Sequence, residues 1–188
     1  MNKEYFDNFE AKLEQELLKL ARSFGQLDDS LLSSEDIDMK WKELAPNYLS
    51  EAVKQLSDYP EFAIGCAAYI GLALAKWWDE DWGKYHGQPF EKLLGSRGFD
   101  NMDDHIMENI LGYPIGSPEG GILSKILLTL ANTTISSIRK EKIEFQSTEM
   151  YHILTRATTV MFRIGAAIEL KKLGYKYHKV NLGNQFHS

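Results

Sequence analysis

The 188-residue sequence has a single cysteine, and its apolar run 62–75 is too short to cross a membrane. One cysteine can form no disulfide within the chain, and at this length a hydrophobic core can bury roughly two-thirds of the unfolded surface without one. Cys66 lies inside an apolar stretch, where a free thiol behaves as a small hydrophobe. The polar residues 1–11 contain no secretory signal. We therefore expect a cytoplasmic protein in a reducing compartment.

Basic residues are also scarce. The chain carries 27 acidic and 21 basic residues, for a net charge of −6. The one basic cluster, Arg139, Lys140 and Lys142, is interrupted by Glu141. Proteins that track phosphates normally present a basic stripe, so we expect neither nucleic acid nor an anionic membrane surface as a partner.

Recognisable catalytic motifs are missing as well. The sequence has no nucleophile elbow, and the glycine-rich segment 112–121 matches neither a phosphate-binding loop nor a dinucleotide fingerprint. The apolar surroundings of Cys66 disfavour the thiolate that nucleophilic catalysis needs. No alternation of apolar and polar residues indicates a strand. The sequence thus names no reaction and predicts no β-sheet.

The most informative stretch is 62–75, which is apolar or small at every position and uncharged. A run of this length is typical of the core helix of a soluble protein, because a membrane span needs about 20 apolar residues. Within it, small residues recur every fourth position, as Ala63, Ala67, Gly71 and Ala75. We expect a buried central helix over 62–78, with a neighbouring backbone close to Gly71.

Helical periodicity and capping signals place the other helices around this one. The predicted segments are 3–24, 34–58 with a break at Pro46, 90–94, 101–111, 118–138 and 147–173. The predicted fold class is all-α, a single-domain helical bundle of about six or seven helices around the buried central helix 62–78. The domain spans 1–174, and 175–188 is predicted to be an irregular C-terminal tail.

An acidic tryptophan patch follows the central helix, where the helix dipole disfavours carboxylates. Such a misplaced charge cluster is a candidate ligand-binding site. Its members are Trp78, Asp79, Glu80, Asp81, Trp82 and Tyr85. In the alternative interpretation, the acids face solvent on the last helical turns while Trp78 and Trp82, four residues apart, pack inward.

Two histidine–glutamate pairs make a divalent metal the cofactor to consider. Glu149 and His152 have the spacing that places two ligands on one helix face in di-iron bundles. His105 and Glu108 have the reverse order, and His86 follows the acidic patch. The alternative interpretation is that these histidines are surface or half-buried residues without a metal and that Glu149 only favours the helix start.

Two arginines and a weakly charged helix bear on partners. Arg156 and Arg163 lie two turns apart on the last helix, so they either bind an anion or, as we expect, pair with acids of a neighbouring helix. The 118–138 helix has a Ser/Thr/Asn face with only Lys125 charged. Such a face is typical of an interface and predicts a homodimer, unless the 175–188 tail covers it.

Two functions remain open at this point. The first is a non-enzymatic helical protein-interaction module or homodimeric structural protein, because apolar stripes are broad and catalytic motifs are missing. The alternative is a metal- or small-ligand-binding helical bundle, including a metalloenzyme, that uses the acidic tryptophan patch and the nearby histidines.

Overall fold

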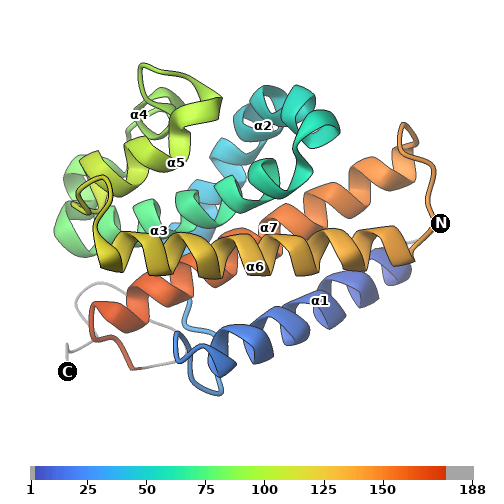
Figure 1. Ribbon diagram of the computed structural model, residues 1–188, viewed down its shortest axis with the longest axis horizontal. Helices are drawn as coiled ribbons and strands as arrows, with labels where there is room; N and C mark the ends of the chain where they lie inside the picture. Colours follow the sequence, from blue (N-terminus) through green and yellow to red (C-terminus); the bar gives the residue numbers. More distant parts are fainter. Residues whose placement is uncertain (1–2, 177–188) are drawn as a thin grey trace.

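The computed structural model describes residues 3–176, and they form a single all-α domain, as predicted (Figure 1). This part of the chain contains seven α-helices and no strand. They are α1 (Lys3–Ser23), α2 (Glu35–Asp58), α3 (Pro60–Tyr85), α4 (Phe90–Leu94), α5 (Met102–His105), α6 (Pro118–Lys140) and α7 (Thr148–Lys172). A 3₁₀ turn, Phe99–Asn101, precedes α5, and a π-helical turn, Ile106–Ile110, follows it.

Helix α3 is the centre of the bundle. Every residue from Ala63 to Ala75 is buried, and the helix packs against α7, α2 and α6. It is longer than the predicted 62–78, since it ends at Tyr85. Its last turn is set apart by Asp81, whose φ of −167° and ψ of 85° are not helical. The Asp81 side chain accepts a hydrogen bond from the Lys84 amide at 3.1 Å, which caps that final turn.

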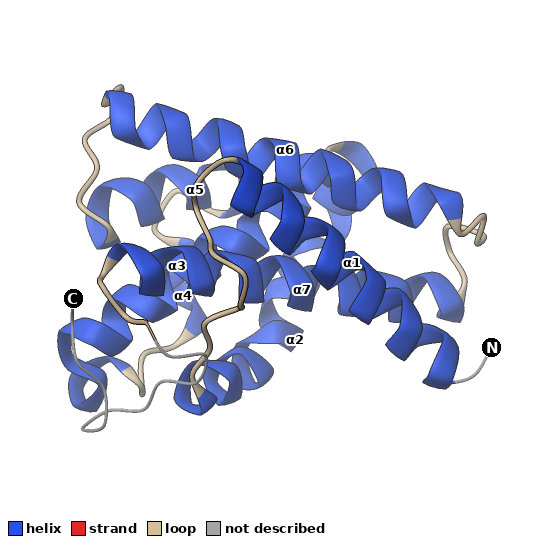
Figure 2. Cartoon of the chain, turned by 90° about the horizontal axis from the view of Figure 1, so that it is seen from below, coloured by secondary structure: helices blue, strands red, loops and turns tan. Residues whose placement is uncertain are grey.

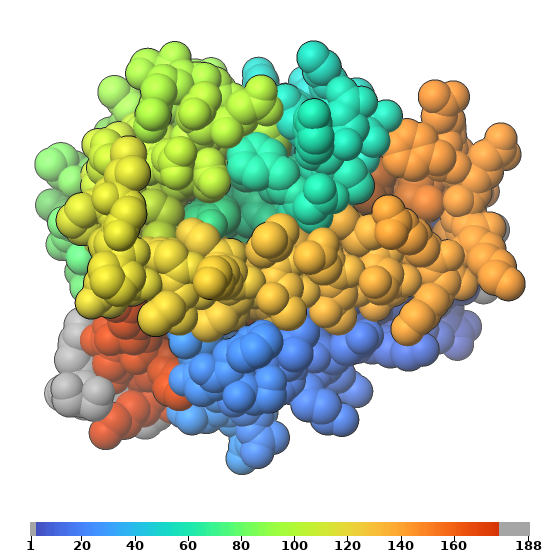
Figure 3. Space-filling model, in the orientation of Figure 1, coloured from blue at the N-terminus to red at the C-terminus, as the bar shows by residue number. Residues whose placement is uncertain are grey.

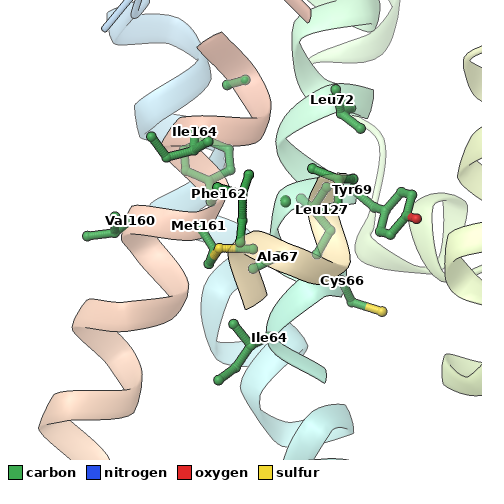
Figure 4. Close-up of a cluster of buried hydrophobic side chains, with 14 of the residues drawn as sticks. Ile64, Cys66, Ala67, Tyr69, Leu72, Leu127, Val160, Met161, Phe162 and Ile164 are labelled. Atoms are coloured by element: carbon green, nitrogen blue, oxygen red, sulfur yellow. The ribbon is translucent and has the colours of Figure 1, made fainter. Parts of the chain in front are cut away.

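The closest approach in the bundle joins α3 to α7. A Cβ atom added at Gly71 would lie 2.2 Å from the carbonyl oxygen of Phe162, so the position admits no side chain. Gly165 is the reciprocal position on α7, because a Cβ there would lie 2.1 Å from the carbonyl oxygen of Ala68. The prediction for Gly71 is confirmed, whereas Gly165 was not foreseen. Figure 4 shows the apolar core beside this contact, including Phe162 and Met161 of α7.

Helix α1 lies along α7 and is joined to it by an ion-pair ladder. Arg156 bonds Asp7 at 2.6 Å and Glu10 at 3.1 Å. Arg163 bonds Glu10 at 3.3 Å and Glu14 at 2.9 Å. The Arg156 guanidinium lowers the pKa of Asp7. The expectation that both arginines pair with a neighbouring helix, rather than bind an anion, is thus confirmed.

The predicted break inside the second helix was wrong. Helix α2 is continuous from Glu35 to Asp58 with Pro46 inside it, where we expected a break. The apolar stripe on both sides of Pro46 packs onto the core: Trp41 stacks on Phe162 with 4.6 Å between ring centroids, and the Tyr48 hydroxyl donates to the carbonyl of Ala63. This packing offsets the backbone hydrogen bond that a proline removes.

The capping signals of the later helices behave as predicted. The Ser117 hydroxyl accepts from the Gly120 amide at the start of α6, and the Ser147 hydroxyl accepts from the Met150 amide at the start of α7. Ser34 occupies the N-cap position of α2, but its buried hydroxyl has no hydrogen-bond partner among residues 3–176. Residues 177–188 of the predicted tail lie outside the described residues.

Candidate functional site

The acidic tryptophan patch is divided by the structure, and its inward half belongs to the core. Trp78 is fully buried, and its indole nitrogen donates to Asp36 at 3.1 Å. Asp79 accepts a hydrogen bond from the Tyr175 hydroxyl at 2.7 Å. The Tyr175 ring packs on Trp78 with 5.3 Å between centroids. These two predicted ligand-binding residues therefore connect α3 to α2 and to the end of α7.

The outward half of the patch faces solvent. Glu80 and Asp81 are exposed, and Trp82 is half-buried. Tyr85 stacks on Trp77 with 5.3 Å between ring centroids. This arrangement matches the alternative interpretation for the acids, while Trp78 and Trp82 differ in burial although both were expected to pack inward.

A buried acid beside the patch was missed. Glu169 of α7 is 3% exposed, and its Oε2 atom has no hydrogen-bond partner among the described residues. Loss of solvation raises its pKa to about 7, with the Lys76 cation opposing the rise and the Asp79 carboxylate adding to it. The sequence carries one signal of this residue, since Glu169 is the only ionisable side chain in the apolar segment 164–170.

We call Lys76, Trp78, Asp79, Glu169 and Tyr175 the polar end of the α3–α7 pair. A cavity of about 380 Å³ opens beside Tyr175, between the 27–32 loop and the end of α7, but Glu169 does not line it. A carboxyl group with a pKa near neutrality can exchange a proton. Here that group is enclosed by protein and does not line this cavity, while Lys76 and Asp79 are half-buried.

The three candidate metal-binding histidines are held by different neighbours. The Nδ1 atom of His86 lies 2.8 Å from the carbonyl of Trp82 in its own helix. The Nε2 atom of His105 lies 2.8 Å from the carbonyl of Lys92. The His152 ring packs on Phe6 of α1, with 4.9 Å between centroids.

Glu108 and Glu149 do not complete a site with these histidines. Glu108 is exposed on the π-helical turn, and Glu149 is half-buried in the first turn of α7. Within residues 3–176, no three His, Cys, Asp or Glu side chains are placed to hold one metal ion. Divalent-metal binding therefore stays a prediction without a geometric site in the described part of the chain.

An open hollow lies at the other end of the α3–α7 pair. Its deeper part has a volume of about 340 Å³, and an adjoining part has about 250 Å³. The two parts share Leu56, Phe145 and Leu154, so they form one continuous surface, which we call the apolar groove. Figure 3 shows the end of α2 and the start of α3 (teal) on one side and the segment joining α6 to α7 (orange) on the other.

Apolar side chains dominate the lining of the groove. Ile64 of α3, Ile135 and Ile138 of α6 and Met150 of α7 line its deeper part. Three large apolar side chains of its outer part, Val53, Phe145 and Tyr151, are exposed. Exposed apolar clusters of this kind on a soluble protein mark interaction or ligand sites.

The sequence does not predict the groove, because its lining residues are spread over several segments. It is formed by the end of α2, the start of α3, the end of α6 and the start of α7, which are brought together only by folding. The local signal was weak: Ile143 and Phe145 are the apolar residues of an otherwise polar connection, 141–147.

Comparison with known proteins finds no matching family model, and no significantly similar curated protein or solved structure. Function is therefore inferred from the geometry of the two ends of the α3–α7 pair. Of these, the apolar groove is open to a ligand, whereas Glu169 at the polar end is enclosed.

Proposed function

We propose that this protein is a non-enzymatic helical interaction module, which binds an amphipathic helix of a partner protein in the apolar groove. The observation that carries the proposal is the groove itself, an open apolar hollow formed by four helix ends with exposed Val53, Phe145 and Tyr151 in its outer part. Grooves of this type accept apolar side chains that recur every three or four residues along one helix face.

The composition of the groove favours a helix over a small molecule. Small-molecule sites combine apolar walls with several placed polar groups that fix the orientation of the ligand. Among the residues that the structure describes, only two with polar side chains, Ser57 and Arg139, line the deeper part of this groove. A row of apolar side chains from a helix needs no such polar set, because its own backbone groups are already hydrogen-bonded.

Arg139 specifies one feature of the partner. It lines the groove, it is exposed, and it forms no ion pair within residues 3–176. A carboxylate on the bound helix would therefore meet an unneutralised cation at this side of the groove. We infer that the partner helix carries an Asp or Glu next to its apolar face.

Selection from a displayed library of helical peptides tests this function. The full-length protein should enrich peptides with apolar residues at helical spacing and a nearby acid, and Arg139→Gln should relax the demand for the acid. Val53→Asp places a charge in the groove and should weaken binding of the selected peptides at least about tenfold.

Met39→Asp is the matched control, because Met39 is 62% exposed and Val53 is 67% exposed on the same helix α2. Met39 does not line the groove. The control should select and bind the same peptides as the unaltered protein. Selection without a helical apolar pattern, or equal binding by Val53→Asp, would overturn the proposal.

A further inference from the structure

A second surface, separate from the groove, lies on the solvent side of α6. Figures 1 and 2 show this helix running along the outside of the bundle, and it packs inward on α3, α1 and α7. We call Ile122, Lys125, Leu128, Thr129, Asn132 and Ser136 the outer face of α6. All six are exposed, with Ile122 at 59% and Leu128 at 49%, and Lys125 is their only charge.

Two threonine hydroxyls on this side of α6 are already hydrogen-bonded within the helix. The Thr129 hydroxyl donates to the carbonyl of Lys125 at 2.9 Å, and the Thr133 hydroxyl donates to the carbonyl of Thr129 at 3.0 Å. Because these donors are already satisfied within the helix, removing them from solvent carries a smaller penalty than it would for free hydroxyls. The outer face can therefore be buried against protein.

The charges near the two ends of α6 have opposite sign. Glu119 lies in the first turn and Lys140 in the last, and neither forms an ion pair among the described residues. Thr129 is near the midpoint between them. If a second α6 lies antiparallel with its own Thr129 at the crossing point, each Glu119 faces the Lys140 of the other copy.

We propose that two copies of this chain pair through the outer faces of α6, antiparallel about a two-fold axis near Thr129. The inference goes beyond the proposed function, because none of the six residues of the outer face lines the apolar groove. Self-association also explains why one exposed face of a long helix has a single charge over the stretch from Ile122 to Ser136.

The area of the outer face of α6 limits the affinity of the proposed dimer. A helix of 23 residues is about 34 Å long, and one face of it buries less than the roughly 800 Å² per partner of a standard interface. Interfaces at this low end are weak and transient. We therefore expect a dissociation constant on the order of 10 μM, with monomer dominant in dilute solution.

A membrane is the competing occupant of this face. Among the described residues, α6 is the one helix long and apolar enough to span a bilayer by length and composition, a test that core helices of soluble proteins also pass. The opposite charges of Glu119 and Lys140 favour a second copy, and Lys125 is the only cation within the outer face itself.

Sedimentation equilibrium of the full-length protein from about 1 to 200 μM tests the dimer. The mass should rise from the 21.5 kDa of the monomer towards twice that value. Thr129→Glu places two like charges at the two-fold axis and should raise the dissociation constant at least about tenfold. A mass of 21.5 kDa at all concentrations would overturn the inference.

A charge exchange tests the antiparallel arrangement. Glu119→Lys and Lys140→Glu should each weaken the dimer several-fold, and the double variant should restore it. If the double variant is no stronger than the single ones, the arrangement is wrong. Both sites are exposed, so circular dichroism should report unchanged folding in all three variants.

Two further measurements separate this inference from its rivals. Val53→Asp should dimerise normally, so that loss of peptide binding and loss of dimerisation are distinguishable. Vesicles of phosphatidylcholine with phosphatidylglycerol should not bind the protein. Binding to these vesicles that Thr129→Glu abolishes, in a protein that stays monomeric, would assign the face to membranes and overturn the dimer.

Discussion

The two ends of the α3–α7 pair differ in the burial of their aromatic side chains. At the polar end, the rings of Trp78 and Tyr175 pack against each other, and both residues are buried. At the groove end, Phe145 and Tyr151 remain exposed beside an open apolar surface. Aromatic side chains are thus packed inside the bundle at one end and exposed to solvent at the other.

This difference shows that clustered charge in a sequence need not indicate an open surface in the folded protein. The acids of the tryptophan patch are either structural, as Asp79 is, or solvated, as Glu80 and Asp81 are. The groove carries almost no charge and depends on residues from four helix ends. Each of the following experiments perturbs one part of this comparison.

The largest effect is expected at the close contact between α3 and α7 around Gly71 and Gly165, which we call the seam. Gly71→Ala or Gly165→Ala would place a Cβ within about 2.2 Å of a facing carbonyl oxygen, so α3 and α7 must separate. We expect each to lower the free energy of unfolding by about 3 kcal/mol or more, measured by urea denaturation.

Gly65→Ala is the matched control for the seam, because its Cβ would meet only the Ala131 Cβ, at 3.9 Å, in ordinary contact. It should leave stability unchanged or raise it by up to about 1 kcal/mol, since alanine favours helix. Equal effects of Gly65→Ala and Gly71→Ala would show that the seam is not tight.

The second effect concerns the polar end and depends on pH. The pKa of Glu169 is raised from 4.5 to about 7 in the folded protein, so the folded state holds a proton that the unfolded state has lost between these values. This bound proton stabilises the folded state fully below pH 4.5, and the stabilisation is lost as the pH rises through about 7. The loss amounts to about 3 kcal/mol.

Glu169→Gln removes this titration and should flatten the fall in stability from pH 4.5 to 7, as measured by urea denaturation across that range. Glu80→Gln is the control, because Glu80 is an exposed acid at the same end of α3. Its pH profile should match that of the unaltered protein. An unchanged slope in Glu169→Gln would show that Glu169 is not the titrating group.

A smaller effect on stability is expected at the groove. Phe145→Ser and Tyr151→Ser change exposed side chains, so each should alter the free energy of unfolding by less than about 0.5 kcal/mol. Both should still reduce the fluorescence of an apolar dye such as anilinonaphthalene sulfonate. Strong destabilisation by either variant would indicate that the groove is part of the core rather than a binding surface.

The smallest effect is expected from divalent metals. Since no three potential ligands converge within residues 3–176, adding Zn²⁺, Mn²⁺ or Fe²⁺ should shift the melting temperature by less than about 1 °C. Elemental analysis of protein purified without a histidine tag is the complementary measurement. Stoichiometric metal would revive the alternative function and assign a role to His86, His105 or His152.

Local patterns predicted much of this fold because helices are specified by residues close in sequence. The apolar run 62–75, the glycine at position 71 and the serine caps at 117 and 147 each have a local physical meaning, and the structure confirms all of them. The break at Pro46 was wrong because Trp41 and Tyr48 are held by tertiary contacts that a local pattern does not contain.

The candidate sites were decided by tertiary structure. Glu169 is buried because α7 packs against α3. The groove exists because an open space remains between four helix ends. Helix type and the apolar face of each helix are local properties, which the sequence by itself determined. The pairing of those faces and the gaps between them are set by close packing of segments more than 80 residues apart, such as Leu56 and Leu154, and only the folded chain decides them.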